Sequence, residues 1–250
     1  MRSFLNAVQF LTRVPVRSPG KLDEDWLLRA AKFFPLVGVF VGCISALIFV
    51  LTGMVWSGIV PALLATTASI ALTGALHEDG LSDTADGLGG GTTLASRLAI
   101  MKDSRIGVYG VLAVGLGIAL RVGALATLAE PVGAAALIAC HTAARFPPMI
   151  ALRTLDHIGD PASAKVSYLG QPIRAGEIAF GAVIVLAGLL PLLAFSALAG
   201  GVGLALGGLL VIWLCRHARR LVGGYTGDIL GAVEQVFEIG FMLGVAAVLG

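Results

Sequence analysis

The densest group of reactive side chains lies between residues 77 and 91, in the run HEDGLSDTADGLGGG. If residues 79–86 are helical, a turn of 100° per residue places Asp79, Asp83 and Asp86 within roughly 60° of one another. Like charges this close repel, and Mg²⁺ binds carboxylate oxygens together with substrate phosphates. The pattern therefore predicts these three aspartates as metal ligands, whereas Glu78 points away from their face. The alternative is a solvated acidic face at a helix end.

A second motif, IMKDSRIGVYG at residues 100–110, contains two cations that suit phosphate groups. Arg105 can donate two parallel hydrogen bonds to phosphate oxygens, and Lys102 can act as a point charge. Asp103 lies between them, where it can orient Arg105 or add a metal ligand. The alternative is a pair of basic anchors at the cytoplasmic end of a membrane span.

The third motif, GGYTGDILGAVEQVFE at residues 223–238, carries acids into an apolar stretch. Asp228 opens this stretch, and Gln235 and Glu238 follow on one broad helical face. Acids within membrane spans are costly, so they are candidates for a functional role. Glu234 falls on a different part of the helical wheel and is open to a structural role.

Two arginines, Arg121 and Arg145, also fall within apolar stretches. An unpaired charge there costs on the order of 2.5–3.5 kcal/mol, so both are expected to face a polar interior. Structural pairing and a role in substrate binding are both open for them. His141 lies four residues before Arg145 and shares its face, either as a packed hydrogen-bonding residue or as a ligand.

The composition indicates which elements must hold these residues in place. Hydrophobic residues make up 57% of the 250 residues and charged residues 13%, against about 25% charged in globular chains. This excludes a water-soluble enzyme, a disordered chain and a disulfide scaffold. Crossing a bilayer takes about 20 apolar residues, and the sequence predicts an all-α membrane helix bundle with about seven transmembrane helices. They are expected near residues 34–55, 58–76, 109–128, 132–151, 178–197, 202–215 and 229–249.

The basic residues predict how the chain is oriented. All of the 17 except Arg121 and Arg145 fall in segments 1–32, 77–108, 153–177 and 216–228, and the other connections hold none. Because cytoplasmic loops keep the excess of Lys and Arg, a cytoplasmic N-terminus and an outside C-terminus are expected. Residues 1–250 are predicted to form one membrane domain. In it, 1–32 is a cytoplasmic amphipathic lead-in rather than a signal peptide, and 77–108 is the acidic active-site segment. No basic aromatic patch indicates nucleic acid.

These motifs, with FLTRVPV at residue 10 and FPLVG at residue 34, resemble the cobalamin synthase family, the adenosylcobinamide-GDP ribazoletransferases. The resemblance runs in order from residue 10 to residue 238. The family pattern His, apolar residue, Asp-Gly-Leu-x-Asp-x-x-Asp-Gly is similar to His77 through Gly87, with Glu78 in place of the apolar residue. The remaining family motifs match Lys102 through Arg105, Thr226 through Asp228, and the downstream pair Gln235 and Glu238.

The resemblance implies a multi-pass enzyme of the inner membrane whose active site faces the cytoplasm. Members join adenosylcobinamide-GDP to α-ribazole or its 5′-phosphate, release GMP and require Mg²⁺. It implies that Asp79, Asp83 and Asp86 hold the metal, that Lys102 and Arg105 bind the phosphates, and that Asp103 or Asp228 accepts a proton. The other expected substrate contacts are His77, Arg145, Gln235 and Glu238. Candidate protein partners are a second copy of the chain and other enzymes of the cobalamin pathway.

Two other functions compete with this one. Asp83-Thr-Ala-Asp-Gly87 matches the first half of the acidic motif of CDP-alcohol phosphotransferases, but the Ala-Arg pair expected next is replaced by Leu88-Gly-Gly-Gly. An ion-coupled transporter would also place acids and arginines within spans. No inverted repeat supports it, and the acids cluster on one expected side of the membrane.

Overall fold

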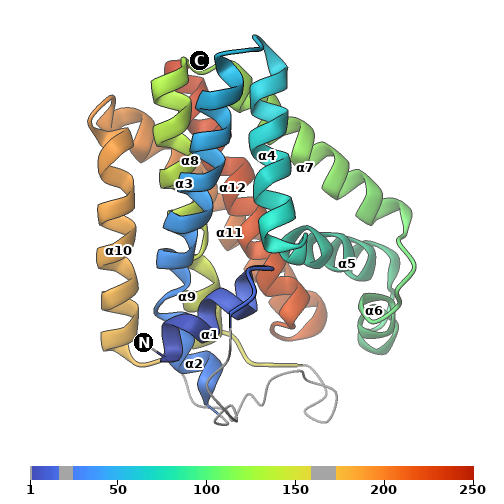
Figure 1. The fold of residues 1–250 in the computed structure, drawn as a ribbon. Coiled ribbons are helices and arrows are strands. Elements are labelled where there is room, and N and C mark those ends of the chain that lie inside the picture. Colours follow the sequence, from blue (N-terminus) through green and yellow to red (C-terminus); the bar gives the residue numbers. More distant parts are fainter. Residues whose placement is uncertain (1, 17–24, 159–172) are drawn as a thin grey trace.

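A computed structural model describes residues 2–16, 25–158 and 173–250, and these residues are built from helices (Figure 1). They contain no strand, only an isolated bridge between His157 and Tyr225. The predicted all-α class is confirmed. The helices are α1 Arg2–Leu11, α2 Trp26–Ala31, α3 Phe34–Gly53, α4 Ile59–Thr73, α5 Leu76–Gly90, α6 Leu94–Met101, α7 Val108–Ala126, α8 Glu130–Ala144, α9 Pro147–Thr154, α10 Ala175–Leu193, α11 Ala197–Val222 and α12 Gly227–Leu249.

Six helical segments of the described chain are long and apolar enough to cross a membrane: α3, α7, α8 with α9, α10, α11 and α12. The apolar helix α4 has 15 residues and bends by 89° into α5, and this pair brings the number of crossings to seven. The prediction of about seven spans is confirmed. In Figure 1 α5, which is rich in polar side chains, runs sideways from the end of α4.

The sixth span differs from the prediction. A short, glycine-rich segment at 202–215 was expected, but α11 continues for 26 residues. Its glycines contact those of α12, since a Cβ on Gly240 would lie 2.8 Å from the Cα of Gly207, and one on Gly244 would lie 2.7 Å from the Cα of Gly203. Small residues allow helices to pack closely in a membrane. The glycines therefore mark a helix contact and do not end the helix.

The fourth span is broken near its end. Helix α8 stops at Ala144 and α9 begins at Pro147, because Pro147 and Pro148 have no amide hydrogen to continue the ladder. The last carbonyls of α8 therefore lack backbone partners. Nη1 of Arg145 donates a hydrogen bond to one of them, the carbonyl of His141, at 2.7 Å. The break thus fixes where the Arg145 guanidinium lies.

The bend between α4 and α5 depends on two residues with positive φ, Gly74 at 66° and Ala75 at 57°. The N-terminal segment packs onto this bend: the amide of Arg13 donates to the carbonyl of Leu72 at 2.8 Å. A Cβ on Gly74 would lie 2.0 Å from Nε of Arg13, so only glycine fits there. This contact holds the segment after α1 against the bend between α4 and α5.

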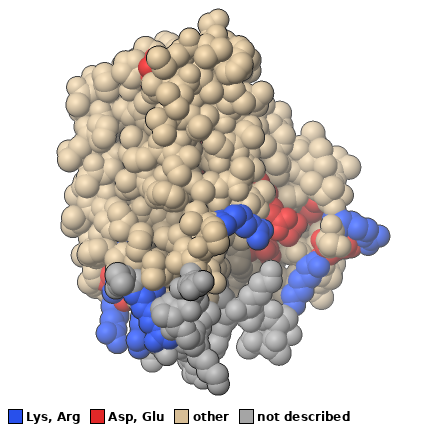
Figure 2. All heavy atoms as spheres, viewed as in Figure 1, with Lys and Arg blue, Asp and Glu red and all other residues tan. Residues whose placement is uncertain are grey.

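The surface divides into a charged end and an apolar body. In Figure 2 the Lys and Arg side chains gather at the end of the molecule that holds the N-terminus, and the C-terminus lies at the other end in Figure 1. Large exposed apolar residues cover α3, α7, α10 and α11. This division suits a protein that crosses a membrane. Three residues of the basic pattern, Arg17, Lys21 and Lys165, lie outside the described residues.

Candidate active site

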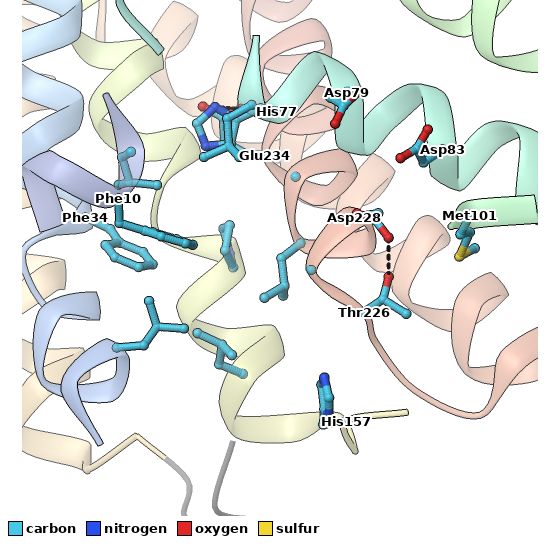
Figure 3. Close-up of a pocket in the computed structure, with 18 of the residues that line it drawn as sticks. Phe10, Phe34, His77, Asp79, Asp83, Met101, His157, Thr226, Asp228 and Glu234 are labelled. Atoms are coloured by element: carbon cyan, nitrogen blue, oxygen red, sulfur yellow. Dashed lines mark hydrogen bonds and ion pairs between the residues drawn. The ribbon is translucent and has the colours of Figure 1, made fainter. Parts of the chain in front are cut away.

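A cavity of about 730 Å³ opens where α1 to α3, α5, α9 and α12 meet (Figure 3). Its volume is within the range of small-molecule sites. Its walls combine an apolar side with charged groups at two ends. The lining residues are Phe10, Leu11, Leu27, Phe34, Leu76, His77, Asp79, Asp83, Leu98, Met101, Lys102, Arg145, Pro148, Leu152, His157, Ile158, Thr226, Gly227, Asp228, Leu230, Gly231 and Glu234.

Three carboxylates form one end of the cavity, which we call the acidic end: Asp79, Asp83 and Asp228. Helices α5 and α12 bring them together, because Gly80 lies directly against α12, where a Cβ would be 2.7 Å from the carbonyl oxygen of Asp228. Burial, together with the charges of Asp79, Asp228 and Asp86, raises the pKa of Asp83 from 3.8 to about 6. The acidic end therefore carries excess negative charge that a cation would relieve.

Asp86 faces elsewhere than the other two aspartates of its motif. Its Oδ2 accepts a hydrogen bond from the amide of Gly107 at 2.7 Å, and its Oδ1 accepts one from Gly110 at 2.9 Å. These amides lie at the start of α7, where backbone N–H groups have no helical partner and favour a negative charge. Asp86 does not line the cavity described above. It anchors α7 to α5, and the metal role expected for it stays a prediction.

The two cations of the second motif are separated. Lys102 lines the cavity. Arg105 does not, and its side chain is 87% exposed and paired with Asp103 at 2.6 Å. The hydrogen bonds from Arg105 hold the pKa of Asp103 down at about 2. In this arrangement Lys102 is placed for a bound phosphate, and Asp103 is a weak base.

Behind the cavity lies a buried network of ion pairs that joins α5, α7, α8 and α12. Glu238 is central: Oε2 pairs with Arg121, Oε1 lies 2.6 Å from Nδ1 of His141, and Oε1 lies 3.6 Å from Nη1 of Arg145. Arg121 also contacts Glu78 at 3.3 Å. The expectation that both span arginines face a polar interior is confirmed. Their charges are balanced by acids from neighbouring helices.

The expected substrate contacts of α8 and α12 divide between the network and the cavity. Arg145 and His77 line the cavity, whereas Gln235 and Glu238 do not. Nε2 of Gln235 donates to Oε2 of Glu234 at 3.0 Å. The structure thus gives Gln235 and Glu238 contacts within the protein, and their role in binding substrate stays a prediction.

Sequence reasoning missed Glu234 as a cavity residue. Its Oε2 lies 3.5 Å from Nδ1 of His77, and its Oε1 lies 3.1 Å from Nη1 of Arg145. The helical wheel of α12 alone separated Glu234 from Asp228. The two line one cavity because the first half of α5, which holds His77 and Asp83, lies along both positions. The only sequence signal was the cost of an acid within a span.

A second cavity residue that the sequence did not single out is His157. Its segment pairs with the start of the third motif: the amide of Ile158 donates to the carbonyl of Tyr225 at 3.0 Å, and the amide of Tyr225 donates to Asp156 at 2.9 Å. A Cβ on Gly224 would lie 1.9 Å from the carbonyl oxygen of Asp156, which explains a glycine there. Burial lowers the pKa of His157, so its imidazole lines the site in the uncharged form at neutral pH.

The carboxylates of the acidic end are oxygen ligands of the kind that a divalent cation binds. Across the described ranges, no three His, Cys, Asp or Glu side chains already converge on a metal position. Mg²⁺, however, usually takes one or two carboxylates, with phosphate oxygens and waters completing the shell. The side chains of Asp79 and Asp83 make no hydrogen bond or ion pair with another described residue. Asp79 and Asp83 therefore fit a cation that arrives with a phosphate-bearing ligand, and Asp228 lines the cavity beside them.

Comparison with known proteins identifies the family. The family model described as Cobalamin-5-phosphate synthase matches residues 3–246. Three similar proteins are each named adenosylcobinamide-GDP ribazoletransferase. The protein of Shewanella frigidimarina is 38% identical, and the match covers 98% of this chain and 94% of the relative. The protein of Shewanella woodyi is 39% identical, with 94% of this chain and 92% of the relative covered. The protein of Leptothrix cholodnii is 40% identical, with 97% of this chain and 94% of the relative covered.

No solved structure matches the chain. The family match decides between the three functions that the motifs left open. The chain belongs to the cobalamin-5-phosphate synthase family and is a multi-pass membrane transferase of cobalamin biosynthesis.

Proposed function

We propose that this chain is an adenosylcobinamide-GDP ribazoletransferase, which joins adenosylcobinamide-GDP to α-ribazole or its 5′-phosphate and releases GMP. The observation that carries the proposal is the cavity, where the motifs shared with the family place three carboxylates and Lys102 beside a largely apolar wall. Relatives of that name match the chain over nearly its whole length. A cavity of this kind suits a ligand with a phosphate-rich part and a bulky, less polar part.

In this proposal Asp79 and Asp83 hold Mg²⁺, and Asp228 beside them is left as a base. When bound, the ion would neutralise charge on the pyrophosphate and on departing GMP. Lys102 would bind the same phosphates as a point charge. Asp86 would position the loop that carries Lys102, since its two hydrogen bonds hold the start of α7 against α5.

The bond changes define what the side chains must do. A free ribose hydroxyl of ribazole, other than the 5′-oxygen that carries the phosphate in α-ribazole 5′-phosphate, forms a bond to the phosphorus on the cobinamide side, the bond from that phosphorus to the bridging oxygen breaks, and GMP leaves. The hydroxyl proton needs an acceptor. Asp228 suits this step better than Asp103, because it lines the cavity whereas Asp103 is held by Arg105 with a pKa of about 2.

We further propose an inner-membrane location with the cavity facing the cytoplasm. Support comes from the basic residues, which gather at the end of the molecule where α1 and α2 lie (Figures 1 and 2). Positively charged segments favour the cytoplasmic side. Hydrophilic nucleotide substrates would then reach the acidic end without crossing the membrane.

The direct test is to incubate the purified protein with adenosylcobinamide-GDP, α-ribazole and Mg²⁺ and to measure GMP and the cobalamin product. We expect both in equal amounts, and neither when Mg²⁺ is chelated. A parallel reaction with α-ribazole 5′-phosphate identifies the preferred acceptor. Absence of GMP from an intact, membrane-inserted protein would refute the proposal.

A further inference from the structure

The cavity has a second polar end, formed by His77, Arg145 and Glu234, which we call the inner end. Helices α5 and α12 run antiparallel here: His77 lies beside Glu234, Gly80 beside Gly231, and Asp83 beside Asp228. His77 and Asp83 on α5, and Glu234 and Asp228 on α12, are each six positions apart, and Asp79 lies between the first two. At 1.5 Å per residue His77 and Glu234 are separated from Asp83 and Asp228 by about 9 Å along the helices. Figure 3 shows His77 and Glu234 on one side and Asp83 and Asp228 on the other.

At the inner end one guanidinium serves two carboxylates: Nη1 of Arg145 lies 3.1 Å from Oε1 of Glu234 and 3.6 Å from Oε1 of Glu238. The network and the inner end together contain three carboxylates, on Glu78, Glu234 and Glu238, but only two guanidinium groups. Glu78 and Glu238 share Arg121, and Glu238 also contacts His141 and Arg145. Glu234 is the carboxylate of this group that lines the cavity.

The hydrogen bonds at the inner end are incomplete on two atoms. Oε1 of Glu234 accepts no hydrogen bond although its side chain is 1% exposed. Nη1 of Arg145 lies 3.1 Å from it and donates to the carbonyl of His141. Nε of Arg145 is likewise buried without an acceptor. The last torsion of a glutamate is soft, so a small rotation presents either oxygen to a ligand. The inner end thus offers one acceptor and one donor side by side.

We infer that the inner end recognises an uncharged primary amide of the substrate, while the acidic end holds the phosphates about 9 Å away. A primary amide supplies an N–H for the glutamate and a carbonyl oxygen for the guanidinium. A carboxylate ligand has no N–H to donate to the glutamate. The inference rests on the proposed function, since cobinamides carry such amides and a nucleotide does not need them.

The test uses the full-length protein in nanodiscs and three separate binding probes: adenosylcobinamide without its nucleotide, Mg²⁺ with GDP, and α-ribazole. Loss of a hydrogen bond to a charged group is expected to make Glu234→Gln bind adenosylcobinamide about tenfold more weakly and leave Mg²⁺–GDP binding within about twofold. The matched control is Glu78→Gln, a buried glutamate of the network that does not line the cavity. We expect it to leave the binding of all three probes within about twofold.

Three outcomes would overturn the inference: equal losses for adenosylcobinamide and Mg²⁺–GDP, equal losses in both variants, or no loss. A loss confined to α-ribazole would show that the inner end binds a hydroxyl group instead. If Glu234→Gln does not fold, the wild-type protein still decides, because it should prefer adenosylcobinamide over a derivative with amides hydrolysed to acids. GMP release by the same wild-type preparation tests the proposed function separately.

Discussion

The acidic end of the cavity and the buried network use similar side chains but differ in how their charges are balanced. In the network, Glu238 contacts Arg121, His141 and Arg145 within the protein. At the acidic end, Asp83 has three acidic neighbours and no cation paired with it among the described residues. Buried ion pairs of opposite charge hold helices together. Neighbouring like charges repel each other, and a bound cation would relieve that repulsion. The comparison separates the residues that hold the helices together from those that we propose to bind metal or substrate.

The largest expected effect is the loss of stability when the network is broken. Replacing Arg121→Met leaves Glu78 and Glu238 without their shared guanidinium, and removing one partner of a buried ion pair costs about 3–5 kcal/mol. Thermal unfolding in detergent should show a much lower Tm. The control is Arg216→Met, which removes an exposed arginine from the end of α11 and should leave Tm unchanged. Equal Tm values for the two variants would contradict the role given to the network.

The next effect is on activity, at the acidic end. Asp83→Asn should lower kcat/KM for GMP release by about 10²–10³-fold, the range seen when one electrostatic contact to a developing charge is lost. Its Tm should not fall, because the variant removes a repelled charge. Asp25→Asn, on the exposed start of α2, serves as the control. Near-normal turnover by Asp83→Asn would remove the acidic end from the reaction.

The raised pKa of Asp83 gives the acidic end a pH dependence that the network lacks. The folded pKa of about 6 is above the usual 3.8, so the fold favours the protonated acid, and this contribution to stability is lost as pH rises through that window. Metal ligands must be ionised. Between pH 5 and pH 7 the ionised fraction rises about tenfold, so the Mg²⁺ concentration for half-maximal GMP release should fall by a similar factor. A value that is constant across this range would contradict the metal role of Asp83.

The smallest effect concerns the exposed pair of Asp103 and Arg105. Lys102→Ala should raise KM for adenosylcobinamide-GDP by about tenfold or more, because it removes a charge beside the phosphates. Arg105→Ala should raise KM by less than about threefold, since the Arg105 side chain is 87% exposed and does not line the cavity. Steady-state kinetics on both variants compares them directly. A larger effect for Arg105 would mean that substrate draws this side chain into the site.

Much of the fold was predictable because it follows from the requirements of a bilayer. Long apolar stretches fixed the positions of most spans, and the spacing of Asp79 and Asp83 correctly placed both on one helical face. The sixth span was predicted too short: residues 202–215 were expected, whereas α11 runs from Ala197 to Val222, through part of the basic segment expected to be a loop. Its glycines pack against Gly240 and Gly244. The spacing of residues along one helix does not reveal which other helix packs against it.

The types and spacing of the motif residues therefore determined the class of protein, the acidic end and the family. The tertiary structure decided which of these residues share a cavity. It turned Asp86 toward α7, placed Asp103 and Arg105 together in solvent, and brought Glu234 beside His77 and Arg145. The reason is physical: helical periodicity sets the face on which a residue lies. Whether that face meets a cavity, a counter-charge or solvent depends on helices distant in the sequence.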